Sequence, residues 1–312
     1  MNILISAFKK DRQAGAGLFD GFNALGKKVR LIFPDKFFWR LPDKNIIRVI
    51  KSFKPDLYIS IGGEDVSSAT LGEIKQRYKI PVIAWITNEP AVMADSRKPH
   101  CWLRFVNYDH LLVVDELWQQ SLQMMTVPKT YLPWAGNNIY RPLGLKKDID
   151  ILFVGEMTPA NGHFSSGWGR ALILNKLLKA NLPITAIAPG IRKFFYYFPE
   201  LKNYRYINRS FSDYRLNQFY NRSKIIIYIN DLMLKTDFDQ AIFNIALSKN
   251  FVITDSKINQ NKLFGSNLVT IKNFEELLDK VRHYLTHENE RRPVTAYTYR
   301  ERAEKIITTL GL

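Results

Sequence analysis

The sequence predicts an α/β protein with two parallel-sheet domains. Short apolar runs alternate with amphipathic helical patterns along almost the whole chain, which is typical of strands joined by helical crossovers. Residues 133–147 interrupt this alternation with two prolines, two glycines and paired asparagines. Because 312 residues also exceed what one hydrophobic core usually serves, we expect one domain on each side of this stretch.

The N-terminal half is expected to begin with a strand. The opening MNILISAF is not predicted to be a secretion signal, because its charges follow the apolar run and no small-residue cleavage site appears. PDLYISIGG predicts a buried strand that ends at Gly62 and Gly63, where the backbone turns sharply or approaches another group closely. The expected strands are 3–7, 29–33, 57–61, 82–86, 110–114 and 130–132, and the expected helices are 17–25, 45–53, 70–79 and 117–124.

A second alternating series follows the interruption. Its expected strands are 150–154, 184–188, 225–229, 251–254 and 268–271, and its expected helices are 170–180, 212–221, 239–248 and 274–285. The tail 294–310 predicts a helix with Arg and Lys on its polar face. We therefore expect domains at 1–140 and 141–295, with 296–312 forming a C-terminal helix that crosses back to the first domain.

Composition narrows the class of protein. Its apolar content of 46% suits a folded protein, and no run approaches the roughly 20 apolar residues of a membrane-spanning helix. The formal net charge of +16 suits a polyanionic partner, namely nucleic acid, an anionic membrane surface or a phosphorylated substrate. A solvated Lys-rich surface is the alternative explanation. No helix-turn-helix, zinc-finger or RNP pattern supports the nucleic-acid alternative.

The single cysteine, Cys101, excludes an internal disulfide and a cysteine-based zinc site. A cytoplasmic location is expected, with peripheral membrane contact as a further option. Cys101 itself is either a buried structural thiol or a nucleophile. The run RKFFYYF, residues 192–198, leaves a similar choice between packed core and an exposed surface that contacts a membrane or stacks on a ligand.

Residues 238–255, FDQAIFNIALSKNFVITD, predict an anion site. They place a helix directly before a buried strand, and such a helix points its N-terminus at the ligand crevice of an open α/β sheet. The first-turn N–H groups and the positive end of the helix dipole favour an anion such as a phosphate. The helix start supplies Asp239 and Gln240 to this site.

Two further groups are expected at the same anion site. One is Gly155 with its loop, and the other is Arg170, for which an ordinary surface arginine is the alternative. Gly167 and Gly169 are expected to let the loop before Arg170 move over a ligand.

A nucleobase pocket is expected just past the second strand of the C-terminal half. Backbone groups of Pro189 and Gly190 would hydrogen-bond the base edge there, and a plain tight turn is the alternative. Thr254 and Asp255 end a neighbouring strand toward the same side, although Asp255 could equally cap the following segment.

Segments in a characteristic order carry a family resemblance over most of residues 54–310. These are KPDLYISIGG, IPVIAWITNEP, YDHLLVVDELWQQSL, TYLPWAGNNIYRP, DIDILFVGEMTP, LNQFYNRSKIIIYIND, IFNIALSKNFVITD, FEELLDKVRHYL and TYRERAEKII. In this order they resemble the CgeB-like (spore maturation protein CgeB-type) glycosyltransferases. The resemblance implies the GT-B fold, in which two Rossmann-like domains face a cleft, with acceptor binding on the N-terminal domain and donor binding on the C-terminal domain.

The resemblance also implies an activity. It is the transfer of a sugar from a nucleotide-sugar, expected to be a UDP-sugar, to a glycan, a lipid-linked or phosphorylated acceptor, or another acceptor. No metal and no cofactor besides the donor substrate is expected. The DxD-like tripeptide Asp237-Phe238-Asp239 is better explained as a helix cap than as a metal ligand.

Three positions depart from the family pattern. Many relatives have Arg, Glu and Gly where this chain has Ala241, Asn244 and Lys249. The family Glu commonly accepts hydrogen bonds from ribose hydroxyls of the donor, and Asn244 keeps an uncharged acceptor for that role. Lys249 adopts a glycine-like left-handed turn only at a cost. A non-catalytic relative therefore stays open as an alternative.

Acceptor activation calls for a general base from the N-terminal domain. Glu89 is the first candidate, because it follows a buried strand and precedes a proline that restricts the turn. Glu64 and Asp115 also follow strands, and His163 lies in the loop before Arg170. A solvated turn carboxylate is the alternative for Glu89, and a core or surface role is the alternative for His163.

Overall fold

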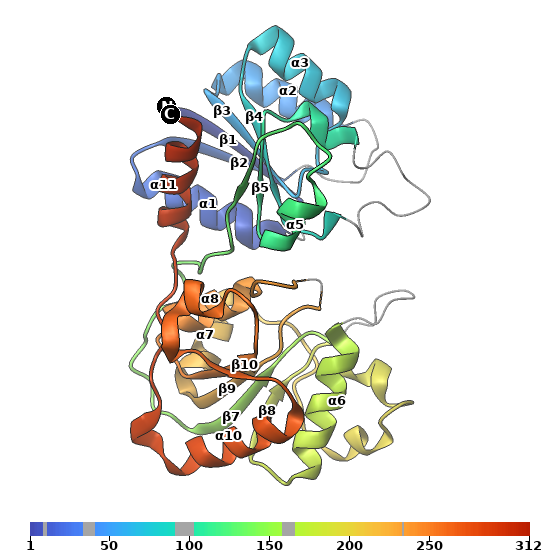
Figure 1. The fold of residues 1–312 in the computed structure, drawn as a ribbon, viewed down its shortest axis with the longest axis vertical. Coiled ribbons are helices and arrows are strands. Elements are labelled where there is room, and N and C mark those ends of the chain that lie inside the picture. Colours follow the sequence, from blue (N-terminus) through green and yellow to red (C-terminus); the bar gives the residue numbers. More distant parts are fainter. Residues whose placement is uncertain (9–10, 34–40, 91–102, 158–165, 233) are drawn as a thin grey trace. The chain divides into compact units, whose positions relative to one another are not determined.

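The structure is a computed structural model that describes residues 1–8, 11–33, 41–90, 103–157, 166–232 and 234–312. The chain divides into two compact units, which Figure 1 shows in sequence colours. Unit 1 comprises Met1–Trp134 and Thr298–Leu312, and unit 2 comprises Ala135–Tyr297. The first division falls six residues before the expected boundary at 140, and the second falls two residues after the expected boundary at 295.

The described part of unit 1 contains a six-stranded parallel sheet in the order β2-β1-β3-β4-β5-β6. Every residue of β3 and β4 is buried, as expected for strands covered on both faces. The strands are β1 Asn2–Ala7, β2 Lys28–Ile32, β3 Leu57–Ile61, β4 Val82–Ile86, β5 His110–Val113 and β6 Lys129–Tyr131. The helices are α1 Arg12–Ala24, α2 Leu41–Phe53, α3 Ser68–Tyr78, η3 Leu103–Asn107, α5 Glu116–Ser121 and α11 Tyr299–Leu310.

The C-terminal helix α11 belongs to unit 1, where it packs on α1 (Figure 1). Thr298 and Glu301 form a capping box at its start, which explains why it begins at Tyr299 and not at the predicted residue 294. The ring of Tyr299 fills the space that a side chain at Gly17 of α1 would occupy. Arg302 anchors the helix further, because its Nε donates to the carbonyl oxygen of Pro133 at 2.7 Å.

The described part of unit 2 contains a five-stranded parallel sheet in the order β11-β10-β9-β7-β8. Its strands are β7 Ile149–Val154, β8 Ile184–Ile187, β9 Ser223–Tyr228, β10 Val252–Asp255 and β11 Val269–Ile271. Its helices are α6 Ser166–Lys179, η4 Ile191–Phe194, η5 Pro199–Asn203, α7 Asp213–Arg222, α8 Gln240–Leu247, α9 Gln260–Phe264, η6 Gly265–Asn267, α10 Phe274–Thr286 and η7 Glu288–Glu290.

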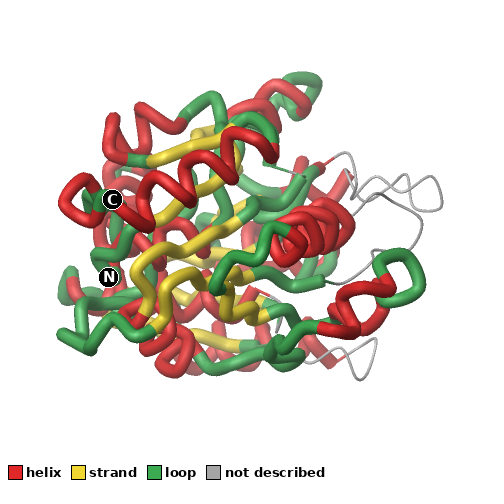
Figure 2. Tube along the Cα trace, turned by 90° about the horizontal axis from the view of Figure 1, so that it is seen from below, coloured by secondary structure: helices red, strands yellow, loops and turns green. Residues whose placement is uncertain are grey.

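The two sheets share one topology. In each, the first strand lies between the second and the third, and later strands extend the sheet on the side of the third. Helices flank the strands on both sides in both views (Figures 1 and 2). The predicted fold class, two Rossmann-like parallel-sheet domains, is confirmed.

Several predicted helix bounds were wrong. The first helix starts at Arg12, before the predicted residue 17, and α6 starts at Ser166, before the predicted residue 170. Gly167 and Gly169 therefore lie in the first turn of α6 and not in a loop, which removes the expected role of both glycines in loop movement. In the part of the chain that the structure describes, no helix has the length and apolar content needed to cross a membrane.

Candidate functional site

The candidate site lies at the carboxyl ends of β7 and β9 in unit 2. These strands are neighbours, but β8 lies on the outer side of β7 and β10 on the outer side of β9, so their crossovers leave in opposite directions. Ligands of open α/β sheets bind at such a switch point. Gly155 directly follows β7, and Asn230 lies just beyond β9.

Arg170 of α6 ties three backbone segments together here. The residue is buried, with 7% of its surface exposed. Its guanidinium donates to the carbonyl oxygen of Ile229 at 2.8 Å, to that of Glu156 at 3.4 Å and to Oδ2 of Asp239 at 3.2 Å. Gly155 makes room for this side chain, since a β-carbon there would lie 2.8 Å from Cδ of Arg170. Among the residues that the structure describes, these bonds use three of the five guanidinium N–H groups, which leaves two for another acceptor.

Asp239, the residue before α8, is held in place by four neighbours. Its Oδ2 accepts bonds from Arg170, from the Tyr228 hydroxyl at 2.9 Å and from the N–H of Asp231 at 2.8 Å. Its own N–H donates to Oδ1 of Asn230 at 2.9 Å. Burial raises the pKa of Asp239 to about 6, and the charge of Arg170 opposes that shift. The carboxylate therefore organises the switch point and does not cap α8.

The first turn of α8 keeps unused hydrogen-bond donors. Within the described residues, no hydrogen bond is formed by the N–H groups of Gln240 and Ala241, and Nε2 of Gln240 is buried without a partner. Such N–H groups, together with the positive helix end, favour a bound anion. The guanidinium of Arg170 lies next to this turn, because it forms an ion pair at 3.2 Å with Asp239, the residue before α8. The arrangement is chemically suited to a phosphate group.

Two residues at the end of β10, Thr254 and Asp255, hold Asn230 in place. Oδ1 of Asp255 accepts a bond from the backbone N–H of Asn230 at 2.7 Å and one from its Nδ2 at 2.8 Å. The Thr254 hydroxyl accepts the second bond of Nδ2, also at 2.8 Å. Asn230 in turn holds Asp239. Asn230 and Tyr228 were not among the site residues predicted from the sequence. The signal available for Asn230 was its place directly after the buried run IIIYI.

The turn after β8 brings Pro189 next to the loop after β7, because the carbonyl oxygen of Pro189 accepts a bond from the N–H of Met157 at 2.7 Å. The N–H of Gly190 donates to Oδ1 of Asn208 at 2.7 Å, and its carbonyl oxygen accepts from Lys193 at 3.1 Å. Gly190 has a φ of +85°, which a tight turn requires. These backbone groups already have partners, so their predicted contact with a nucleobase stays a prediction.

The family departures in α8 have clear local structures. Asn244 is buried, and its Oδ1 accepts a bond from the N–H of Asn137 at 2.8 Å, so the oxygen expected to face a ribose already has a partner in unit 2. Lys249 follows the helix with a φ of +56°, the left-handed conformation in which glycine is more usual. The chain thus closes α8 with the expected turn despite the lysine.

The proposed general bases lie in unit 1, at the carboxyl ends of two neighbouring strands. Glu64 follows β3 and Glu89 follows β4, and both side chains are half-buried. Asp115 instead caps α5, accepting a bond from the N–H of Leu117 at 2.9 Å. His163 lies outside the described residues, as does Cys101.

The described residues contain no group of three His, Cys, Asp or Glu side chains that could hold a metal ion. Asp237 of the DxD-like tripeptide is buried and accepts bonds from the Thr236 hydroxyl and from Nδ2 of Asn259 at 2.8 and 3.1 Å. It therefore has a structural role in the approach to α8.

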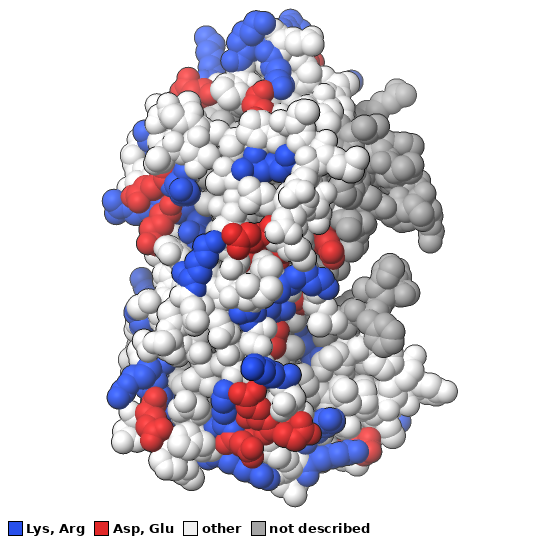
Figure 3. All heavy atoms as spheres, viewed as in Figure 1, with Lys and Arg blue, Asp and Glu red and all other residues white. Residues whose placement is uncertain are grey.

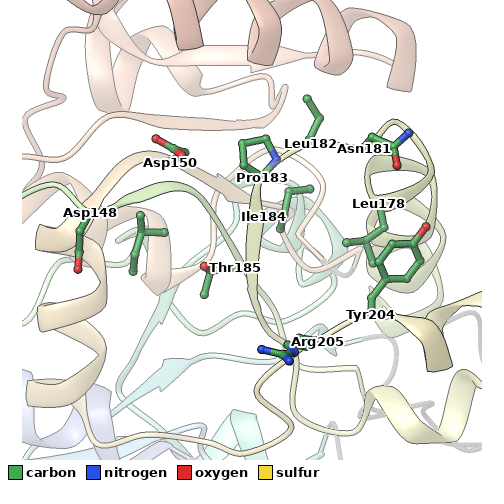
Figure 4. A pocket seen from close by; sticks show the side chains of 11 residues that line it. Asp148, Asp150, Leu178, Asn181, Leu182, Pro183, Ile184, Thr185, Tyr204 and Arg205 are labelled. Carbon is green, nitrogen blue, oxygen red and sulfur yellow. The ribbon is translucent and has the colours of Figure 1, made fainter.

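A groove of about 520 Å³ opens at the other end of the unit 2 sheet (Figure 4). It lies beside the amino ends of β7 and β8, between Asp148, Asp150, Thr185 and Arg205. Both acids are paired with basic neighbours, Asp148 with Arg222 at 2.6 Å and Asp150 with Lys224 at 2.7 Å. The groove is thus separate from the switch point.

Comparisons with known proteins agree with a fold of two parallel-sheet α/β domains. A family model described as Glycosyl transferase-like matches residues 170–308, which begin at Arg170 and include α8. A search of curated proteins with this sequence found no match.

Three solved structures illustrate the similarity in fold. Sucrose-phosphate synthase from Thermosynechococcus elongatus has a TM-score of 0.66 at 11% identity, covering 100% of this chain and 97% of that chain. Anabaena Alr3699/HepE, solved in complex with UDP and glucose, has a TM-score of 0.65 at 12% identity, with coverages of 100% and 99%. UDP-GlcNAc 2-epimerase from Methanocaldococcus jannaschii has a TM-score of 0.61 at 11% identity, with coverages of 100% and 99%. These likenesses support the GT-B type of two-domain fold.

Proposed function

We propose that the protein is a glycosyltransferase that binds the diphosphate of a nucleotide-sugar at the switch point of unit 2. The observation that carries this proposal is the set of unused donors at the start of α8, next to the buried guanidinium of Arg170. Leaving of a nucleoside diphosphate requires stabilisation of developing negative charge, which helix N–H groups and a guanidinium provide. The family match over residues 170–308 agrees with this activity.

A uridine nucleotide is the first donor to test. The Anabaena protein of the same fold was solved with UDP and glucose, and the epimerase of the same fold acts on UDP-GlcNAc. The positive helix end and Arg170 supply the charge in this proposal, so transfer is expected to persist when EDTA is added. The acceptor is proposed to be a glycan or a lipid-linked or phosphorylated compound.

The donor site is tested by titrating UDP into the protein and into the variants R170A and Q240A. Loss of a charge-assisted contact should weaken UDP binding by about 1.5–3 kcal/mol in R170A, and loss of a neutral donor by about 0.5–1.5 kcal/mol in Q240A. The control R222A removes an arginine of the Asp148 pair at the opposite end of the sheet and should bind UDP like the parent. Absence of binding for every nucleoside diphosphate at millimolar concentration would reject the donor site.

Glu89 is proposed as the general base and Glu64 as the second candidate. Replacing the catalytic carboxylate by Gln should lower kcat about 100-fold or more while UDP affinity stays unchanged. Donor hydrolysis or transfer with a panel of nucleotide-sugars provides the readout. UDP binding without turnover of any donor would instead favour the non-catalytic alternative.

Nucleic-acid binding is the competing proposal, based on the net charge of +16. On the face that Figure 3 shows, however, Lys and Arg are scattered among Asp and Glu and form no continuous basic stripe. A gel-shift series at rising salt separates the two functions, because nucleic-acid binding of this kind falls steeply with salt.

A further inference from the structure

The run Arg192–Phe198, which we term the aromatic-basic segment, divides between core and surface. It lies in the long connection 188–212 between β8 and α7, whose regular structure in the described chain is limited to η4 and η5. Phe194 is buried in the unit 2 core, and the ring of Phe195 packs on the ring of Tyr206 with centroids 5.8 Å apart. The segment is therefore anchored in the core by part of its residues, and other residues of RKFFYYF are exposed.

Two tyrosines of the segment face solvent. Tyr196 is 88% exposed and Tyr197 is 54% exposed. Both rings pack on neighbouring rings. The Tyr197 ring packs edge-on against Trp168 with centroids 4.3 Å apart, and the Tyr196 ring packs edge-on against Tyr197 with centroids 5.2 Å apart. Trp168 in turn contacts the buried Phe194 at 5.2 Å. A row of rings thus runs from the core to the surface.

Positive charge accompanies these rings. Arg192 and Lys193 are exposed and form no ion pair with any described residue. The connection 188–212 has five basic residues, Arg192, Lys193, Lys202, Arg205 and Arg209, and one acid, Glu200, which gives a net charge of +4. Glu200 is paired with Lys179 at 2.7 Å, so it does not neutralise the segment.

We propose that the aromatic-basic segment is a contact site for an anionic lipid surface. Tyrosine suits a membrane interface, because its ring enters the acyl boundary while its hydroxyl stays hydrated. Adjacent Arg and Lys are attracted to anionic head groups. Single-stranded nucleic acid fits less well, because the edge-on packing of Tyr196, Tyr197 and Trp168 leaves no parallel set of ring faces for successive bases. This proposal does not depend on glycosyl transfer.

Vesicle flotation tests the proposal with the full chain. The probes are phosphatidylcholine vesicles and vesicles in which phosphatidylglycerol replaces part of the phosphatidylcholine. We expect binding to the anionic vesicles only, decreasing with salt. The variant R192S/K193S should reduce the partition coefficient on the order of 20-fold, and Y196S/Y197S should also release the protein. The single variant Y196S, at an almost fully exposed position, preserves the test if the double tyrosine variant fails to fold.

The controls carry matched changes elsewhere. R282S/K305S removes the same charge from exposed positions of α10 and α11, and Y214S removes a tyrosine that is 56% exposed on α7. Both controls should bind vesicles like the parent. Equal loss in the control and segment variants, equal binding to both vesicle types, or binding of single-stranded DNA in preference to anionic vesicles would each overturn the proposal.

Discussion

Arg170 crosses directly over Gly155, so the residue after β7 decides whether the guanidinium reaches the end of β9. A β-carbon at position 155 would lie 2.8 Å from Cδ and 3.4 Å from Nε of Arg170. Both atoms belong to a side chain held by bonds to Ile229 and Asp239. The glycine and the arginine therefore form one unit of the candidate site.

The variant G155A should displace Arg170 and weaken UDP binding on the order of tenfold, with a loss of about 1–3 kcal/mol in the free energy of unfolding from overpacking. Isothermal titration and thermal unfolding measure the two effects. G169A is the matched control, since a β-carbon at this α6 position meets nothing within 4 Å. Wild-type UDP affinity in G155A would contradict the role assigned to Arg170.

The stability of unit 1 should depend on the ionisation of Asp65. This residue is 3% exposed, its Oδ1 accepts a bond from the Ser60 hydroxyl, and its Oδ2 has no partner among the described residues. Burial raises the pKa of Asp65 from 3.8 to about 6. The folded state thus holds its proton to a higher pH than the unfolded chain, and the folded state loses stability as pH rises from about 4 to about 6.

The variant D65N removes this titration. The free energy of unfolding of D65N should equal that of the parent at pH 4. Above pH 6 it should exceed the parent's by up to about 3 kcal/mol, since one pKa unit corresponds to about 1.4 kcal/mol. Chemical unfolding at a series of pH values measures the difference. D279N, at an exposed position of α10, is the control and should follow the parent. A pH-independent difference for D65N would refute the assignment.

The packing of α11 on α1 should not tolerate an added methyl group at Gly17. Tyr299 occupies the space next to Gly17, so G17A forces the ring or the helix to move and should cost about 1–3 kcal/mol or more in stability. G72A introduces the same methyl group into α3, where a β-carbon meets nothing within 4 Å. That control should be neutral or stabilising by about 0.5–1 kcal/mol. Comparison of the two melting temperatures tests the packing.

The left-handed turn at Lys249 predicts a difference between two substitutions. Glycine adopts a φ near +56° without a β-carbon clash, so K249G should be more stable than K249A by about 1 kcal/mol. Both variants lose the same charge, which makes each the control for the other. Denaturant unfolding measures the comparison, and equal stabilities would show that the turn carries no strain.

Much of the fold was predictable from local pattern. Buried parallel strands give continuous apolar runs such as LYISI and VIAWI, and helices of the crossovers give apolar residues at helical spacing. The predicted helix bounds were wrong where a cap sets the end of the helix, as at Thr298. A capping box depends on which neighbouring hydrogen bonds the chain forms. The apolar pattern does not contain that information.

The candidate site was predictable in part. Gly155, Arg170 and Asp239 were expected near one anion, and they meet at the switch point. Asn230 escaped notice because its importance comes from bonds to Asp239 and Asp255, nine and 25 residues away. Asn244, in contrast, was predicted to accept a bond from the donor ribose, but its side-chain oxygen accepts a bond from Asn137, 107 residues earlier.

The amino-acid order alone determined the alternation of strands and helices, the two-unit division and the helix end that favours an anion, because each depends on neighbours along the chain. Tertiary structure decided the partners of Arg170, Asp239 and Asn244. Side chains distant in sequence compete for the same donors and acceptors, and that competition is settled only when the strands are placed side by side.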